Sequence, residues 1–116
     1  MISYALIIEG YDVIIFQHGA LLIDNLDEYK PNFIFLDIKM PKISGYDVLK
    51  AIRSISSVPI IILTGIMDTE AIYACIEMGA DDYVKKPFYP HELVSGVVSK
   101  LHRVALQFAW NRIWIY

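Results

Sequence analysis

The sequence predicts an α/β fold with a doubly wound, mostly parallel sheet. Apolar, β-prone runs alternate along the 116 residues with segments of helical periodicity, which is the pattern of successive βα units. The runs at 33–36 and 60–63 contain no polar residue, as expected for strands covered on both faces by helices. The mean hydropathy of +0.45 agrees with a sheet that is largely buried.

The elements follow one another in a regular order. They are a helix over 1–9, a strand over 12–16, a helix over 20–29, a strand over 33–37, a helix from 44 through 52, a strand over 59–64, a helix from 68 or 69 to 78, a strand over 82–86 and a long helix from His91. The strands are assigned from β-branched and aromatic residues bounded by turn residues. The helices are assigned from apolar residues at helical spacing.

Local signals set the ends of these helices. Gly10 and Gly79 stop the first and fourth helices, and Pro31 ends the second, whose Leu22, Leu26 and Tyr29 are expected on one side. Ser44 can cap the third helix, and Asp68 or Thr69 the fourth. The last helix presents apolar residues at positions 94, 97, 98, 101, 104 and 108.

The bulk properties exclude several classes of protein. The net charge is −3 without a basic stripe, so nucleic-acid binding by this domain alone is not expected. No apolar stretch reaches the roughly 20 residues of a membrane span, and the amino-terminal residues do not read as a signal peptide. The single cysteine, Cys75, excludes an internal disulfide and is expected to be a small buried hydrophobe in a cytoplasmic protein.

Three chemically distinct side chains stand at successive strand ends. Asp37 closes the second predicted strand, Thr64 closes the third, and Lys86 closes the fourth. The carboxyl ends of parallel strands border the crevice in which open α/β sheets bind ligands. An acid, a hydroxyl and an ammonium group at one edge suit a phosphoryl group better than hydrolysis or metal-only chemistry. No nucleophile–base pair or metal-ligand spacing indicates a hydrolase or a zinc site.

Several motifs in a fixed order carry a resemblance to a known family. They are Leu36–Pro41, Ser44–Tyr46, Leu63–Gly65 and Gly79–Phe88. With them, the chain resembles a receiver domain of the two-component response regulators over about residues 4–104. The resemblance implies a flavodoxin-like sheet and a signalling module that is not an enzyme in its own right.

The resemblance also implies a role for each site residue. Asp37 would be the phosphoacceptor, and Thr64 and Lys86 would bind the phosphoryl group. Tyr83 would be the aromatic switch that responds when Thr64 moves. The structural alternatives are a capping or salt-bridged Asp37, a Thr64 bonded to its own loop, a solvated Lys86 and a half-buried edge-strand Tyr83.

One part of the family pattern is absent. Receiver domains open with a central strand that ends in two acidic residues, whereas this sequence begins within the following helix. Asp37 and the main-chain carbonyl of Lys39 are then the remaining protein ligands for Mg²⁺, the family's cofactor, so weak or absent binding and poor phosphorylation are expected. The Asp81–Asp82 pair is expected at the opposite end of the sheet and cannot replace the missing acids.

The missing strand also leaves a central vacancy in the expected sheet. We divide the chain into a truncated receiver-like domain, residues 1–109, and a strand-prone tail, residues 110–116. Residues 113–116 are predicted to fill part of the vacancy, within one chain or by exchange in a homodimer. Alternatively, the tail extends the last helix or packs on a neighbouring surface.

Two functions from different classes remain. The first is a phosphoacceptor module that receives its phosphoryl group from a histidine kinase or a phosphotransfer protein. The second is a degenerate or truncated receiver that acts only through protein–protein association. The resemblance places the contact face on the Ile72 helix, the Tyr83 strand and the His91 helix.

Overall fold

The computed structural model describes residues 2–38, 44–65, 69–85, 89, 92, 93, 95 and 112–116. The helices in these ranges are α1 (Ile2–Ile8), α2 (Gly19–Tyr29), α3 (Ser44–Ile55) and α4 (Thr69–Glu77). The strands are β1 (Asp12–Ile15), β2 (Phe33–Ile38), β3 (Ile60–Thr64), β4 (Asp82–Lys85) and β5 (Arg112–Ile115). None of the described helices is long and apolar enough to cross a membrane.

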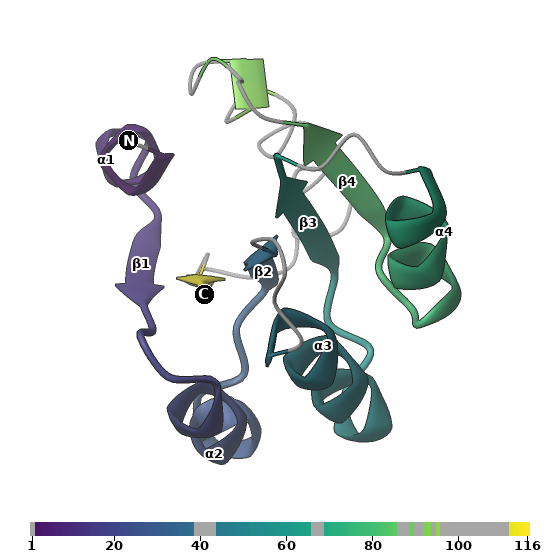
Figure 1. Cartoon of the computed structure of the whole chain (residues 1–116). Helices are drawn as coiled ribbons and strands as arrows, with labels where there is room; N and C mark the ends of the chain where they lie inside the picture. The colour runs from purple at the N-terminus through teal and green to yellow at the C-terminus, as the bar shows by residue number, and fades with distance from the viewer. Residues whose placement is uncertain are drawn as a thin grey trace.

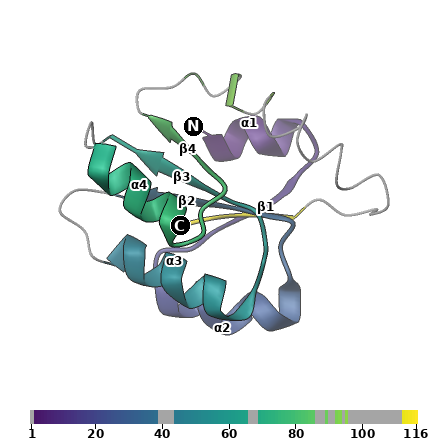
Figure 2. The same ribbon diagram turned by 90° about the vertical axis from the view of Figure 1, so that its right-hand side faces the viewer.

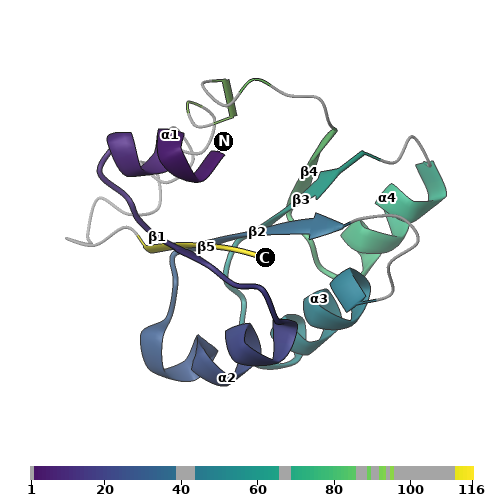
Figure 3. The same ribbon diagram turned by 60° about the vertical axis from the view of Figure 1, so that its left-hand side comes forward.

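The five strands form one parallel sheet in the order β1-β5-β2-β3-β4 (Figure 1). The strand that comes last in the sequence therefore lies between the first two. Ile113 is in register with Val13 of β1 on one side and with Phe33 of β2 on the other. Figure 3 shows β5 running beside both neighbours across the middle of the sheet.

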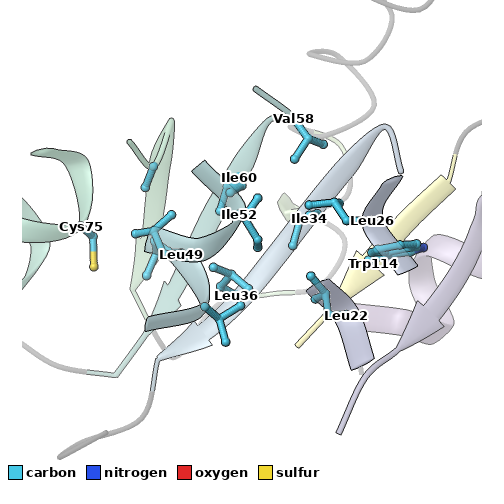
Figure 4. Close-up of a cluster of buried hydrophobic side chains, with 13 residues drawn as sticks. Leu22, Leu26, Ile34, Leu36, Leu49, Ile52, Val58, Ile60, Cys75 and Trp114 are labelled. Carbon is cyan, nitrogen blue, oxygen red and sulfur yellow. The ribbon is translucent and has the colours of Figure 1, made fainter. Parts of the chain in front are cut away.

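Helices cover both faces of the sheet. The helix α1 lies on one face, and α2, α3 and α4 lie on the other (Figure 2). The core between the sheet and the three helices includes Leu22, Leu49, Ile60 and Trp114 (Figure 4). A second core under α1 is formed by Leu6, Tyr11, Phe33, Phe35, Ile61, Leu63, Leu93 and Ile113. Alternate residues of β2 and β3 enter the two cores, which explains their uninterrupted apolar sequences.

The helices and strands predicted up to β4 are present in the described residues, with ends no more than three positions from those predicted. Two apolar helix residues are more exposed than their neighbours. Tyr29 is 45% exposed and does not continue the buried row of Leu22 and Leu26, because α2 ends there in the left-handed Lys30. Ile76 is 39% exposed although its neighbour Cys75 is buried as expected. The apolar positions of the long helix predicted from His91 lie outside the described residues.

The tail was predicted to enter the sheet over residues 113–116. In the structure β5 covers Arg112–Ile115 and pairs with both β1 and β2. Ile113 and Trp114 are fully buried, one in each core. The pairing joins the two cores through the centre of the sheet.

Candidate functional site

The structure brings Asp37 and Thr64 to the same edge of the sheet. Asp37 is in register with Leu63, and Thr64 is in register with Ile38. The two residues are thus one position apart on hydrogen-bonded neighbouring strands, at the carboxyl ends of both. Lys86, the third residue of the predicted site, and Lys39 lie outside the described residues.

Strand alternation determines where a shared ligand could bind. Asp37 follows Phe33 and Phe35, whose side chains enter the core under α1. Thr64 follows Ile60 and Ile62, which enter the opposite core. Because successive side chains of a strand point to opposite faces, an anion that touches both groups must lie above the strand ends. This is the position in which open α/β sheets bind ligands.

The two groups differ in exposure. Thr64 is 4% exposed and is one of two buried polar residues among those described, together with Ser3. Asp37 is half-buried, so its carboxyl group remains accessible from the edge. Asp37 and Thr64 each take part in at least one interaction with other groups. The Thr64 hydroxyl is a hydrogen-bond donor that burial keeps away from bulk solvent, whereas the Asp37 carboxylate is accessible.

The end of β5 also reaches this edge and makes backbone contacts that the sequence did not indicate. The main-chain N–H of Asp37 donates to the carbonyl of Tyr116 at 2.6 Å, and the N–H of Tyr116 donates to the carbonyl of Phe35 at 2.9 Å. The backbone that carries the candidate acceptor is therefore held on its β1 side by the tail. To predict this contact from the sequence, one would have to know the register of two strands that are about 80 residues apart.

A second unpredicted contact fixes that register. The N–H of Arg112 donates to Asn32 Oδ1 at 2.7 Å, and the N–H of Asn32 donates to the carbonyl of Arg112 at 2.8 Å. The Arg112 guanidinium donates to the carbonyl of Tyr29 at 2.6 Å. These bonds anchor the start of β5, so Tyr116 follows the Phe35–Ile115 pair and its main chain bonds to both Phe35 and Asp37.

Tyr83, the predicted switch, lies on β4 beside the site. It is in register with Ile62, and the next pair toward the carboxyl edge on that face is Thr64 with Lys85. Tyr83 is 37% exposed. Tyr83 thus lies on the same face of the sheet as Thr64, one strand away. Lys85 is exposed.

The carboxylates of the described residues do not form a magnesium shell at this edge. No group of three or more His, Cys, Asp or Glu residues that could hold a metal ion occurs within the described part of the chain. The residue that β5 brings to the backbone of Asp37 is Tyr116, whose side chain carries no carboxylate. Mg²⁺ prefers an octahedral shell rich in carboxylate and water oxygens, and one carboxylate fits such a shell poorly.

The Asp81–Asp82 pair lies at the other end of the sheet, as predicted. Asp82 begins β4 and is in register with Ile61, near the start of β3. Asp81 accepts a 2.7 Å bond from the N–H of Ile60 and a 2.9 Å bond from Arg53. Its role in this structure is to join β3 to α3, and it contributes nothing to the Asp37 edge.

Comparison with known proteins identifies the same family over most of the chain. The profile of the response regulator receiver domain matches residues 1–98. The DNA-binding response regulator MtrA of Mycolicibacterium smegmatis is 39% identical over 103 residues, which are 89% of this chain and 45% of that protein. A probable transcriptional regulator, ycf27, of Porphyridium aerugineum is 43% identical over 95 residues, 82% of this chain and 40% of that protein. The chain thus spans about half the length of the curated relatives that it matches.

Solved structures resemble the fold over similar ranges. A putative response regulator from Chloroflexus aurantiacus is 34% identical with a TM-score of 0.77, covering 89% of this chain and 87% of that one. A two-component response regulator from Clostridium difficile is 26% identical with a TM-score of 0.80, covering 89% and 85%. The BeF3-activated receiver domain of DrrB is 33% identical with a TM-score of 0.72, covering 88% and 86%.

Proposed function

This chain belongs to the response regulator receiver domain family, and from that premise we propose that it accepts a phosphoryl group on Asp37. The observation that supports this proposal is the placement of Asp37 and Thr64 at the carboxyl ends of hydrogen-bonded neighbouring strands. The donor is a histidine kinase or a phosphotransfer protein, by analogy with the family. The chain acts as a signalling module rather than as an enzyme with its own substrate.

The proposed reaction uses the chain's own residues. A carboxylate oxygen of Asp37 attacks the phosphorus of a phosphohistidine, the P–N bond breaks, and an acyl phosphate forms. The leaving imidazole keeps the electron pair of that bond. The Thr64 hydroxyl donates a hydrogen bond to a phosphoryl oxygen, and Lys86 supplies the positive charge that the family places there. No step is assigned to Mg²⁺, because the described carboxylates fit its shell poorly.

We further propose that Tyr83 reports the phosphorylated state. Thr64 and Tyr83 share a face of neighbouring strands, so movement of the hydroxyl toward a phosphoryl oxygen changes the space available to the ring. The partly exposed Tyr83 ring can move from the surface toward the core at a small cost in free energy. Such a local change can bias the contact surface formed by α4 and β4.

Mass spectrometry of the intact chain after incubation with acetyl phosphate tests this function. Wild type is expected to gain one phosphoryl group, and Asp37→Asn to gain none, because an amide is a poor nucleophile. Asp24→Asn is the matched control, since Asp24 is an exposed aspartate on α2 outside the site. Labelling that persists in Asp37→Asn would contradict the assignment of the acceptor.

The second candidate is a receiver that is not phosphorylated and acts by association alone. Three tyrosines outside the cores favour it: Tyr73 on α4 is 64% exposed, Tyr83 37% and Tyr89 74%. Exposed aromatic side chains are enriched at protein interfaces. Wild type that gains no phosphoryl group with or without added Mg²⁺ would favour this function. Nucleic-acid contact by this domain itself is not part of either proposal, given its net charge of −3.

A further inference from the structure

The slot between β1 and β2 has the properties of a strand-binding groove. We propose that this groove accepts residues 112–116 from a second copy of the chain, producing a reciprocal strand-exchanged dimer. The occupant is specified by the structure, because the same segment of the same chain fills the groove in the described fold. The inference does not depend on phosphorylation of Asp37.

Both walls of the groove are open strand edges when β5 is removed. From β1, the N–H of Phe16 donates to the carbonyl of Ile115 at 2.8 Å. From β2, Asp37 donates to the carbonyl of Tyr116 at 2.6 Å. Facing strand edges favour the addition of an extended segment. An added strand satisfies hydrogen-bonding groups on both sides at once.

Side chains make the groove selective for this segment. Trp114 is 1% exposed and meets the Phe16 ring edge-on, with 4.8 Å between ring centroids. Ile113 is fully buried in the opposite core. A strand that lacks a large residue on one face and a branched residue on the other would leave unfilled space in one of the cores.

The groove also fixes the register of its occupant. Asn32 forms two hydrogen bonds with the backbone of Arg112, through its N–H and its side-chain oxygen. The Arg112 guanidinium adds a third contact, to Tyr29. None of these contacts depends on which copy supplies the segment. A strand from a second copy would therefore seat in the same way.

Chain length permits the exchange. Sixteen residues, 96–111, separate Ser95 from Arg112. A chain spans at most about 3.4 Å per residue, or roughly 54 Å, which exceeds the 36 Å longest extent of the molecule. With the helix predicted from His91 extended, the segment can thus reach its own groove or that of an adjacent copy. The contacts are the same in both cases. The ratio of exchanged dimer to monomer therefore depends on how the chain concentration compares with the effective concentration of the chain's own tethered strand.

Exchange would link the candidate sites of two copies. In the dimer, the carbonyl of Tyr116 from one copy accepts the hydrogen bond from Asp37 of the other. Each site would then contain a backbone group of its partner. Because the two exchanges are reciprocal, the assembly has two-fold symmetry and closes without forming a fibre.

Cysteine cross-linking between two full-length variants tests the exchange. Ile15 and Ile115 are in register on β1 and β5, and both retain some exposure. Isotopically light Ile15→Cys is mixed at high concentration with heavy Ile115→Cys, each in a Cys75→Ala background, and then oxidised. The expected result is a light–heavy disulfide at least tenfold more abundant than with the control partner Ile55→Cys, whose position on α3 is 53% exposed.

Native mass spectrometry of mixed light and heavy wild-type chains gives an independent readout. Light–heavy dimers that increase with chain concentration are expected. Wild type that remains monomeric at every concentration would overturn the proposal. So would dimers whose Ile15→Cys and Ile115→Cys cross-link does not exceed the Ile55→Cys control, because those dimers would form through another surface.

Discussion

Arg53 joins α3 to the loop before β4 through several contacts. Its Nε donates to the carbonyl of Gly79 at 2.6 Å, and its Nη2 meets Asp81 Oδ2 at 2.9 Å. Gly79 has φ +109° and lies against the Arg53 side chain, so a larger residue there would be both strained and crowded. Asp81 in turn accepts from the N–H of Ile60.

We expect Arg53→Ala to lower the free energy of unfolding by about 1–3 kcal/mol, mainly through loss of the hydrogen bonds that its charged group donates to partly buried carbonyls. The ion pair itself contributes little, because the Asp81 side chain is 56% exposed. Urea denaturation followed by circular dichroism measures the change. Lys50→Ala, on the exposed side of α3, should stay within about 0.5 kcal/mol of wild type. Equal losses in the two variants would contradict the role of Arg53.

Cys75 makes stability sensitive to alkaline pH. Burial raises the pKa of the Cys75 thiol above its ordinary value of 9.0. The unfolded chain therefore loses this proton at lower pH than the folded chain, so the stabilising contribution is complete below pH 9.0 and is lost as pH rises through the folded pKa. Burial, and secondarily Glu9, also raise the pKa of Tyr11, which adds to the loss at higher pH.

The expected result is a urea midpoint that falls as pH increases past 9.0, with a shallower fall in Cys75→Ala. Tyr11 still titrates in that variant, so some slope should remain. Identical slopes in wild type and Cys75→Ala would show that the thiol is not the titrating group. Slow reaction of native Cys75 with a thiol reagent, accelerated in urea, would independently verify its burial.

Among the elements, β5 is short but contributes to both cores. It has only four residues, yet it supplies a fully buried residue to each side of the sheet. Trp114 Nε1 is buried and finds no hydrogen-bond partner among the described residues. The indole thus contributes through its packing against Phe16, and a ring without an N–H can replace it.

We therefore expect Trp114→Ala to cost about 3–5 kcal/mol and Trp114→Phe to cost much less. Phenylalanine keeps an aromatic contact with Phe16 and removes the unpaired N–H, although it fills less volume. Thermal and urea unfolding of both variants measure the difference. Similar losses in both variants would mean that aromatic packing on Phe16 is not what stabilises β5.

At the scale of the whole molecule, local patterns predicted most of the fold. The strands ending at Asp37 and Thr64 were evident because buried parallel strands are apolar throughout. Helix ends were evident from Gly10, Pro31 and Gly79. These signals lie within a few residues of the features they specify, so a single sequence contains them.

The tail was predicted to fill the vacancy, but the individual hydrogen bonds that hold it in the sheet were not evident from such patterns. The bonds between Asn32 and Arg112 join residues 80 positions apart, and no local property of either residue indicates the other. The hydrogen bond from Asp37 to Tyr116 likewise depends on a register that only the assembled sheet defines. The sequence therefore predicted that Asp37 and Thr64 lie at neighbouring strand ends. It did not predict that the main chain of Tyr116 would bond to the backbone of Asp37.

Deleting residues 112–116 tests how far the whole fold depends on this central strand. Burial of Ile113 and Trp114 contributes roughly 1.5–3 kcal/mol each, a large part of the 5–15 kcal/mol typical of a domain. We expect the shortened chain to lose cooperative unfolding or to associate. In the full chain, hydrogen exchange should be slow at the amides of Phe16 and Asp37, which donate to β5. In the shortened chain, the same amides should exchange rapidly.

The amide of Ala80 provides the internal control for that measurement. It donates to the carbonyl of Cys75 at 3.0 Å, within the turn that ends α4 and away from β5. If α4 keeps its local structure in the shortened chain, exchange at Ala80 should change less than exchange at Phe16 and Asp37. An unchanged unfolding midpoint, with all three amides still protected, would show that the sheet is complete without β5. Both the support of the Asp37 backbone by Tyr116 and the strand exchange would then have to be abandoned.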